Sequence, residues 1–160
     1  DGWNVAMATL GFERGTSSLA EQITMSRVVE RLIENAHNQL GPDGVRPAIK
    51  DDEIASRLAT LRAEVAALRA MSYASISRAQ RNFVPGSEGT IIGIYNSEML
   101  QRIFRMAADL MGAGMLDFND SEENWIYEYH RSIMTTIGGG TSEIRRNIIG
   151  ERVLGLPRDR

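Results

Sequence analysis

The stretch GGGTSEIRRNIIGERVLGLPR, residues 138–158, decides how the rest of the chain is interpreted. After three glycines, Thr141 or Ser142 can cap a helix, because its side-chain oxygen can accept a hydrogen bond from a free backbone N–H. Glu143 in the first turn complements the positive end of the helix dipole. Gly155 tolerates a left-handed turn and Pro157 cannot continue a helix, so both terminate it. The stretch therefore predicts a glycine loop followed by a short closing helix.

The glycine loop, Gly138–Gly140, has two interpretations when it is taken alone. A backbone without side chains before a helix lets a ligand approach closely and offers it N–H groups. Three successive glycines are also common in turns that only need conformational freedom. The loop by itself leaves both interpretations open.

The composition is that of a single domain with its own core: 160 residues, 42% hydrophobic, 24% charged and a net charge of −3. No apolar run reaches the 18 residues of a membrane span, and Asp1-Gly2-Trp3 lacks the basic and apolar start of a signal peptide. Basic and acidic residues are interspersed, so we expect no nucleic-acid partner. Without cysteine there is no disulfide or thiolate metal site. We expect a cytoplasmic protein without a bound metal.

Helical spacing of apolar residues covers almost the whole chain. A first helix is expected from Leu19 to Leu40, before the breaker Gly41-Pro42-Asp43-Gly44. A second helix of about thirty residues should start near Asp51 or Asp52, since acids suit a helix N-terminus. The first two apolar stripes are Leu19, Ile23, Ser26, Val29, Ile33, Ala36 and Leu40, and then Ile54, Leu58, Leu61, Val65, Leu68, Ile76, Ala79 and Phe83.

The second half of the chain continues this pattern. Pro85-Gly86-Ser87 ends the second helix, and a third runs up to Gly112-Ala113-Gly114 with the stripe Ile92, Tyr95, Met99, Ile103, Met106 and Leu110. A polar turn at 117–124 precedes a short helix over 123–132. These elements predict an all-α, antiparallel bundle of the four-helix type with a short closing helix. A helix of about thirty residues spans about 45 Å, a length that often packs against another subunit.

Two motifs resemble the acyl-CoA dehydrogenases. The stretch at 138–158 is similar to their C-terminal signature GGT(N/S)EIxRNIIxxRxLGLPR, and GWNVAMATL followed by Glu13-Arg14 is similar to their GWxVAMxTLxxER segment. The expected helices also match the C-terminal domain of that family in order and length. The resemblance covers essentially all of the chain. It implies that residues 1–160 form one C-terminal helical domain, with residues 1–14 as the junction from a β-domain that this chain lacks.

The family reaction is the α,β-dehydrogenation of an acyl-CoA thioester. A carboxylate removes the α-proton, and the β-hydrogen leaves as a hydride to FAD. Such a reaction requires a positioned base with a raised pKa and donors aimed at the enolate oxygen. In the family most flavin contacts come from the β-domain, so this fragment alone should not turn over substrate. The implied partners are an acyl-CoA, an electron-transfer acceptor protein and further subunits of a homotetramer or heterotetramer.

Glu13 is the base that the resemblance implies. Some family members use the Glu of a Y-E-G-T loop, whose place is taken here by Gly139, and others use the Glu of an E-R pair on the first helix, as in Glu13-Arg14. Arg14, Gly139 and Gly140 would form the substrate-binding group. Arg14 would steady the base or the local backbone, and the Gly139 N–H would polarise the thioester carbonyl. Taken without the family, Glu13 and Arg14 would be ordinary solvated surface residues.

The resemblance assigns Thr141, Ser142 and Glu143 to FAD. The family's second FAD contact reaches a neighbouring subunit's diphosphate through R-x-x-F-G and Q-x-x-G-G motifs. Here these read His37-Asn38-Gln39-Leu40-Gly41 and Asp109-Leu110-Met111-Gly112-Ala113. A neutral histidine replaces the fixed guanidinium, and an aspartate adds a negative charge.

These two changes favour an alternative function, a non-catalytic assembly subunit of a heteromeric acyl-CoA dehydrogenase-like complex. In such complexes only some subunit pairs form complete FAD sites. An acyl-CoA oxidase, which would use oxygen as its electron acceptor, is a third possibility. His130 lacks partners at metal-ligand spacing and is interpreted as structural.

Overall fold

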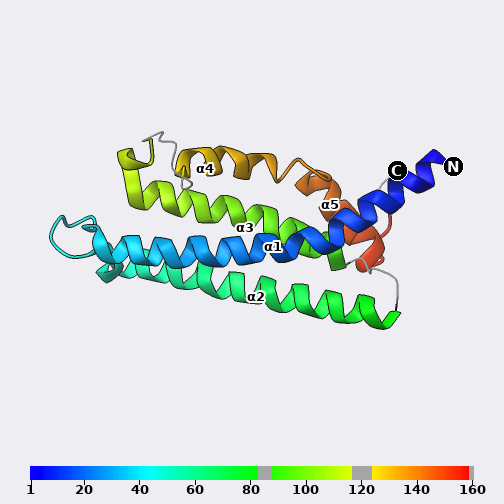
Figure 1. Ribbon diagram of the computed structural model, residues 1–160, viewed down its shortest axis with the longest axis horizontal. Coiled ribbons are helices and arrows are strands. Elements are labelled where there is room, and N and C mark those ends of the chain that lie inside the picture. Colours follow the sequence, from blue (N-terminus) through cyan, green and yellow to red (C-terminus); the bar gives the residue numbers. More distant parts are fainter. Residues whose placement is uncertain (83–87, 117–123, 159–160) are drawn as a thin grey trace.

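The computed structural model describes residues 1–82, 88–116 and 124–158, apart from the side chains of residues 7, 8, 10–19, 79, 82 and 88. Three long helices, α1 (Gly2–Asn38), α2 (Asp52–Asn82) and α3 (Glu88–Met111), lie antiparallel along one axis. The shorter α4 (Trp125–Met134) packs along α3 and completes the bundle, and α5 (Ser142–Ile148) closes the chain (Figure 1). The predicted all-α bundle is confirmed.

Short helical turns extend the main helices. A 3₁₀ turn, η1 (Ala48–Lys50), precedes α2, and another, η2 (Gly112–Leu116), follows α3. A π-helical turn, η3 (Ile149–Val153), continues α5 until Gly155, whose φ of 66° ends the helix as predicted. Strand pairing within 1–82, 88–116 and 124–158 is limited to one isolated bridge between Leu40 and Pro47.

Side chains cap the starts of α2 and α4, and the α2 cap lies where the sequence predicts that helix to start. Asp51 caps α2, since its Oδ1 accepts hydrogen bonds from the backbone N–H groups of Glu53 and Ile54, both at 3.1 Å. Asn124 caps α4 by accepting from the Tyr127 N–H at 3.0 Å. The predicted helix end at 85–87 and residues 117–123 of the predicted polar turn lie outside the part of the chain that the structure describes.

The core confirms two of the three predicted stripes and corrects the first. The described positions of the α2 and α3 stripes are buried or, at Ile54, Ile76, Tyr95 and Leu110, partly buried. In the first stripe Ile23 and Leu40 are 49% and 64% exposed, and Ser26 is also exposed. The side chains of Leu19, Ala79 and Phe83 lie outside the described part of the structure. The face that α1 buries comprises Gln22, Met25, Val29, Leu32 and Ala36. The two stripes share Val29 and Ala36. Both stripes are apolar, so packing against α2 and α3 decides that the one with Met25 and Leu32 faces the core.

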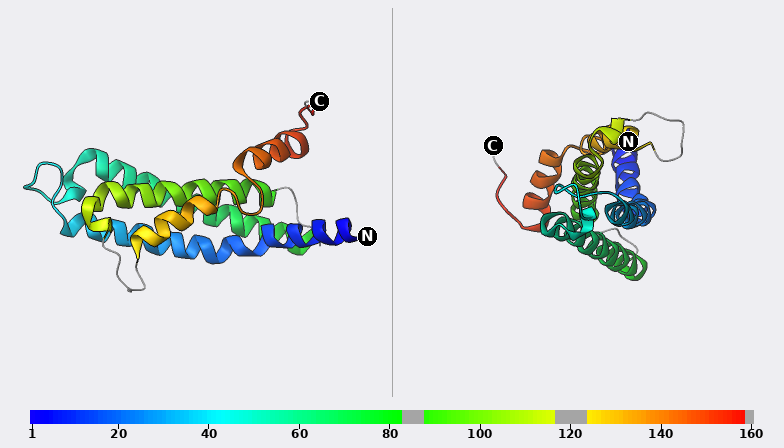
Figure 2. Two further views of the ribbon diagram at one scale, coloured as in Figure 1. Left: turned by 90° about the horizontal axis from the view of Figure 1, so that it is seen from above. Right: turned by 90° about the vertical axis from the view of Figure 1, so that its left-hand side faces the viewer.

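The first helix also begins much earlier than predicted, at Gly2 rather than Leu19. Glycine lowers helix propensity, and three glycines in the first 15 residues of the chain weaken the sequence signal there. The N-terminal end of α1 projects past the other helices, with Trp3 77% and Val5 65% exposed (Figure 2). No helix within the described ranges is long and apolar enough to span a membrane.

The connection from α1 to α2 is a tight loop organised by Asp43. Its Oδ1 accepts from the backbone N–H groups of Val45 and Arg46, both at 2.9 Å, and its Oδ2 accepts from the Arg46 Nε at 2.7 Å. Gly44, at a φ of 66°, turns the chain back. The loop therefore holds the start of α2 beside the end of α1.

An NMR titration is expected to give Asp43 a carboxyl pKa of about 2, below its ordinary value of 3.8. The Arg46 side chain is the main cause, followed by the N–H groups of Arg46 and Val45. Because folding lowers this pKa, the charged carboxylate stabilises the fold above pH 3.8, and its contribution is lost as the pH falls through about 2. Arg46→Gln should raise the pKa towards 3.8. An unchanged pKa in that variant would contradict this account.

Candidate functional site

The glycine loop between α4 and α5 is a sharp, internally bonded turn. Gly139 and Gly140 have φ angles of 69° and 111°, in the region that side-chain-bearing residues rarely adopt. The Gly138 N–H donates to the Met134 carbonyl at 3.0 Å, and the Gly140 N–H donates to the Ile137 carbonyl at 3.3 Å. The backbone conformation therefore favours glycine at 139 and 140.

One donor of this loop is free to meet a ligand. The Gly139 N–H finds no acceptor among the residues that the structure describes, and Gly139 is exposed. A backbone N–H beside a position with no side chain is suited to an oxygen that develops negative charge. The geometry of Gly139 therefore fits the predicted substrate contact, which stays a prediction.

The start of α5 confirms the predicted helix cap. Thr141 is the N-cap, and its Oγ1 accepts from the Ile144 N–H at 3.4 Å. The pKa of the Glu143 carboxyl is lowered, first by its own backbone N–H and then by the Thr141 hydroxyl. Ser142 is buried and Glu143 is exposed, so only the latter presents its side chain to the surroundings. The roles of all three toward FAD stay predictions.

Glu13 and Arg14 both lie in α1, with side chains outside the described part of the structure. The N-terminal half of α1 and the segment that carries the glycine loop and α5 lie at the same end of the bundle (Figures 1 and 2). The fold therefore brings the helix of the predicted base and the predicted substrate loop to one end. The catalytic role of Glu13 and the supporting role of Arg14 stay predictions.

The residues assigned to a neighbouring subunit's FAD lie at the opposite end of the bundle. His37 is exposed at the end of α1, and Gly112 and Ala113 are exposed just after α3. Asp109 near the end of α3 is held by Arg57 of α2, with the Arg57 Nη2 at 2.5 Å from the Asp109 Oδ2. The residues predicted to bind the substrate and the chain's own FAD therefore lie at one end of the bundle, and those predicted to contact a neighbour's FAD lie at the other.

The chemistry of this second cluster does not suit a diphosphate. Arg57 also lies 3.9 Å from a Glu53 carboxylate oxygen, so two carboxylates face one guanidinium. A diphosphate would have to compete with Asp109 for that guanidinium and would be repelled by the acids. Sequence reasoning identified Asp109 as a departure from the family pattern, but it could not find Arg57, which lies 52 residues away in the chain.

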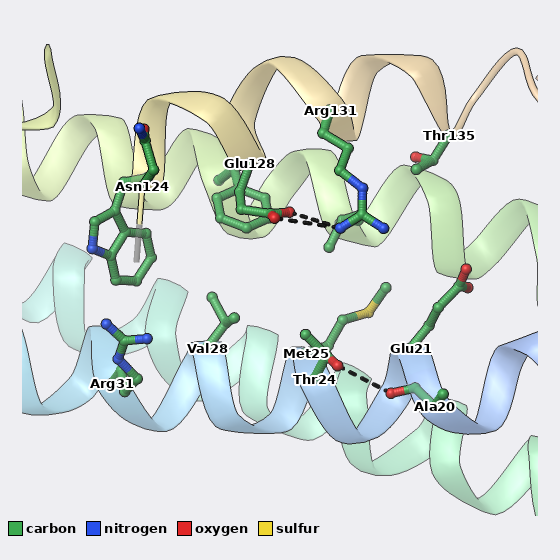
Figure 3. Close-up of a pocket in the computed structure, with 13 residues that line it drawn as sticks. Ala20, Glu21, Thr24, Met25, Val28, Arg31, Asn124, Glu128, Arg131 and Thr135 are labelled. Carbon is green, nitrogen blue, oxygen red and sulfur yellow. Dashed lines mark hydrogen bonds and ion pairs between the residues drawn. The ribbon is translucent and has the colours of Figure 1, made fainter. Parts of the chain in front are cut away.

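A groove of about 370 Å³ lies between α1 and α4 above α3 (Figure 3). Its wall carries Trp125, which stacks edge-on against Phe104 at 6.1 Å between ring centroids and lies under the Arg31 guanidinium at 5.2 Å. Glu128 and Arg131 form an ion pair at its rim, at 3.2 Å. Within the described ranges, no cluster of three histidine or acidic side chains could hold a metal ion.

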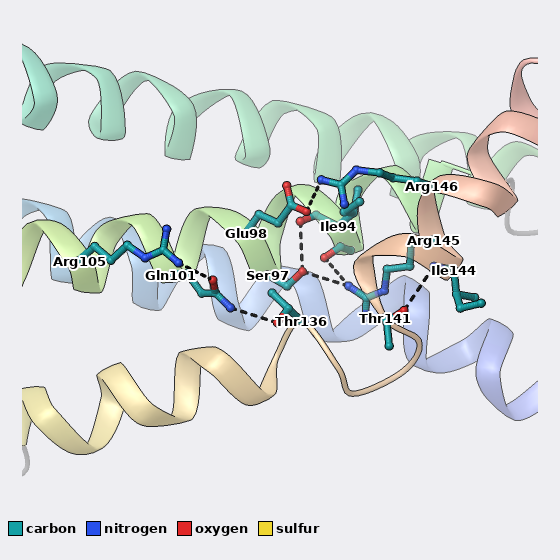
Figure 4. A network of polar contacts seen from close by, with 11 residues as sticks. Ile94, Ser97, Glu98, Gln101, Arg105, Thr136, Thr141, Ile144, Arg145 and Arg146 are labelled. Atoms are coloured by element: carbon teal, nitrogen blue, oxygen red, sulfur yellow. Dashed lines mark hydrogen bonds and ion pairs between the residues drawn. The ribbon is translucent and has the colours of Figure 1, made fainter.

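Two arginines of α5, Arg145 and Arg146, tie this end of the molecule to α3 (Figure 4), and no pattern in the sequence points to either as a functional residue. Arg145 donates to the Gly93 carbonyl at 2.7 Å and to the Gly138 carbonyl at 2.8 Å. Arg146 forms an ion pair with Glu98 at 2.5 Å. Both lie in the closing motif, but their partners on α3 lie about 50 residues earlier, where no local pattern points to them.

Comparisons with known proteins agree with this architecture. Residues 1–154 match the family model of the acyl-CoA dehydrogenase C-terminal domain. Acyl-CoA dehydrogenase IpdE1 of Mycobacterium tuberculosis is 35% identical over 160 residues, and that of Mycolicibacterium smegmatis is 36% identical. The chain therefore belongs to the acyl-CoA dehydrogenase family, of which it has the C-terminal domain.

These relatives are longer proteins. The alignments cover 99% of this chain but only 39% and 38% of the two relatives, so the chain spans about two fifths of their length. Among solved structures, an FAD-dependent dehydrogenase has a TM-score of 0.81 at 19% identity, covering 94% of this chain and 39% of that one. The Tcur3481-Tcur3483 steroid ACAD has a TM-score of 0.80 at 23% identity, covering 99% and 40%. These likenesses establish the fold.

Proposed function

We propose that residues 1–160 are the C-terminal domain of an FAD-dependent acyl-CoA dehydrogenase, with residues 1–14 adjoining a β-domain. The main supporting observation is the exposed Gly139 N–H, which lies at the same end of the bundle as the N-terminal half of α1. The family membership and the 35% identity to an acyl-CoA dehydrogenase support the reaction class that we propose. The reaction is the α,β-dehydrogenation of an acyl-CoA thioester.

In this proposal Glu13 removes the α-proton and Arg14 steadies its carboxylate. The Gly139 N–H donates to the thioester oxygen, where negative charge develops as the proton leaves. The absence of side chains at Gly139 and Gly140 lets the thioester lie close to the backbone. Thr141, Ser142 and Glu143 would hold FAD, which supplies the hydride acceptor when it is bound.

The Arg57–Asp109 ion pair favours a second candidate, a non-catalytic assembly subunit. The subunit would use the same bundle for assembly but would not complete a neighbour's FAD site from the end that carries His37 and Asp109. In a heterotetramer the partner subunit would supply that contact. In a homotetramer the contact with a neighbour's FAD would have to come from His37, Gly112 and Ala113, while Arg57 stays paired with Asp109. In either assembly the helical faces would join the subunits, and an electron-transfer protein would reoxidise the flavin.

Anaerobic mixing of the full-length protein with acyl-CoA thioesters distinguishes these functions. A dehydrogenase should purify with FAD, alone or with its partner subunit, and should lose the oxidised-flavin absorbance when substrate is added. Bound FAD that no acyl-CoA in a panel of straight, branched and polycyclic acyl groups reduces would contradict the proposal. Absence of flavin both alone and with the partner would favour the assembly subunit. Hydrogen peroxide formed in air at the rate of turnover would indicate an oxidase.

A further inference from the structure

Arg145 joins its own helix to the glycine loop seven residues earlier and to α3, about 50 residues earlier in the sequence. Its Nη1 donates to the Gly93 carbonyl at 2.7 Å and to the Ser97 Oγ at 3.2 Å, both on α3, and its Nη2 donates to the Gly138 carbonyl at 2.8 Å (Figure 4). A planar guanidinium can make such bonds in several directions at once, because its donors form a rigid fork. The side chain therefore connects α5, α3 and the glycine loop.

The α3 side of this connection is firmly held. Ser97 is only 2% exposed, and its hydroxyl donates to the Ile94 carbonyl at 3.1 Å. With that proton engaged, the Ser97 oxygen is left to accept from Arg145. Gly93 lies in the same helix one turn earlier, and its carbonyl is the second acceptor. The guanidinium is thus fixed against a buried and hydrogen-bonded part of α3.

The loop side is held at two places. Gly138 accepts from Arg145, while the Gln101 Nε2 on α3 donates to the Thr136 Oγ1 at 3.0 Å, near the start of the loop. Gly139 lies directly against the same guanidinium, since a Cβ atom at this position would be only 3.3 Å from the Arg145 Nη2. The free Gly139 N–H and the Gly138 carbonyl that Arg145 holds belong to the same peptide bond.

The geometry of this peptide bond links the Arg145 hydrogen bond to the direction of the Gly139 N–H. The Gly138 carbonyl and the Gly139 N–H are the two ends of one planar unit, so fixing the oxygen also fixes the direction of the N–H. Without this bond the peptide would be unusually free to reorient, because glycine has more backbone freedom than any other residue. A single hydrogen bond to the oxygen therefore sets the orientation of the donor on the other side.

We propose that Arg145 is a positioning residue that aims the Gly139 N–H by anchoring the Gly138 carbonyl to α3. The anchoring stands on the contacts of Arg145 alone. Its consequence for catalysis rests on the proposed function, in which that N–H meets the thioester oxygen. Arg145 itself does not touch the substrate in this account. Its neighbour Arg146 pairs with Glu98 of α3 and so ties α5 to the bundle at a different place.

The test uses the full-length flavoprotein with Arg145→Gln, Arg145→Lys and, as a matched control, Arg146→Gln. Hydrogen exchange of the peptide covering residues 135–141 is measured by mass spectrometry. Arg145→Gln should accelerate exchange in this segment by about 10- to 100-fold, the loss expected for hydrogen bonds to a charged group. Arg145→Lys should recover part of the protection, because an ammonium keeps the charge but cannot reproduce the fork. Arg146→Gln should leave exchange in the loop close to that of the wild type.

Kinetics separate positioning from a general structural effect. With acyl-CoA as substrate, Arg145→Gln should lower kcat about tenfold or more, while FAD content and the thermal midpoint match those of Arg146→Gln. Ser97→Ala, which removes only the Ser97 acceptor of Arg145, should give a smaller change in the same direction and serves if Arg145→Gln does not fold. Loop exchange equal to the wild type in both Arg145→Gln and Ser97→Ala would overturn the inference.

Failure of the inference and failure of the proposed function look different. If loop exchange rises in Arg145→Gln but no acyl-CoA reduces the wild-type flavin, the anchoring holds and the proposed function is wrong. If acyl-CoA reduces the wild-type flavin and loop exchange does not respond to Arg145, the inference is wrong and the proposed function holds.

Discussion

Glu13→Gln in the full-length enzyme is expected to slow the reduction of FAD by acyl-CoA by about 10²- to 10⁴-fold, the usual contribution of a general base. Glutamine has nearly the same shape and keeps a hydrogen-bonding side chain, but it cannot accept the α-proton. Binding of the acyl-CoA should therefore remain close to that of the wild type. Anaerobic stopped-flow absorbance of the flavin measures the rate, and a titration with the enoyl-CoA product measures the binding.

Glu34→Gln is the matched control for this experiment. Glu34 is an exposed acid on the same helix, nearer the end that carries His37, so its loss removes the same charge without touching the predicted site. It should leave the reduction rate unchanged. A rate in Glu13→Gln equal to that of Glu34→Gln would rule out Glu13 as the base, and a rate reduced equally in both would point to net charge instead.

Leu32→Ala should lower the free energy of unfolding of this 160-residue chain by about 2–5 kcal/mol, the range for large-to-small changes in a packed core. Leu32 is 0% exposed in the C-terminal part of α1 and belongs to the core cluster that α2 and α3 complete. Truncation removes apolar contacts and leaves a cavity that the three long helices can fill only partly. Urea denaturation followed by circular dichroism gives the change.

Leu40→Ala supplies the same chemical change at an exposed position. Leu40 is 64% exposed just after α1, so we expect its truncation to change the unfolding free energy by less than about 0.5 kcal/mol. Equal losses in Leu32→Ala and Leu40→Ala would show that the face of α1 defined by Met25 and Leu32 is not the one that packs in solution.

Local signals were enough to predict most of the fold. The caps Asp51 and Thr141 mark helix starts through bonds to nearby residues, and Gly112 marks the end of α3 through its φ of 53°, so these ends can be read from short segments. The start of α1 could not be read in this way, because glycines near the N-terminus weaken its helical pattern. Its buried face was also misassigned, since Ile23 and Met25 are both apolar and only packing against α2 and α3 distinguishes them.

The candidate site was predictable only where its residues are contiguous. The glycine loop and its helix cap form one stretch, and the structure bears out their local geometry. The Arg145 anchor and the Arg57–Asp109 pair join residues about 50 positions apart, and arginine on a helix surface is common enough that sequence alone suggests no partner. Long-range ionic contacts of this kind depend on helix register, which the tertiary fold determines.

The distance between the two ends of the bundle determines how inactive variants of this protein should behave when they are expressed together. The 31 residues of α2 alone extend about 46 Å, so the glycine loop and the Arg57–Asp109 pair are too far apart to share one small cofactor. In a homotetramer in which His37, Gly112 and Ala113 did contact a neighbour's flavin despite the Arg57–Asp109 pair, each chain would serve two different flavins. Two inactive alleles, one damaged at each end, would then complement each other when coexpressed, because some mixed oligomers would unite both undamaged ends around the same flavin.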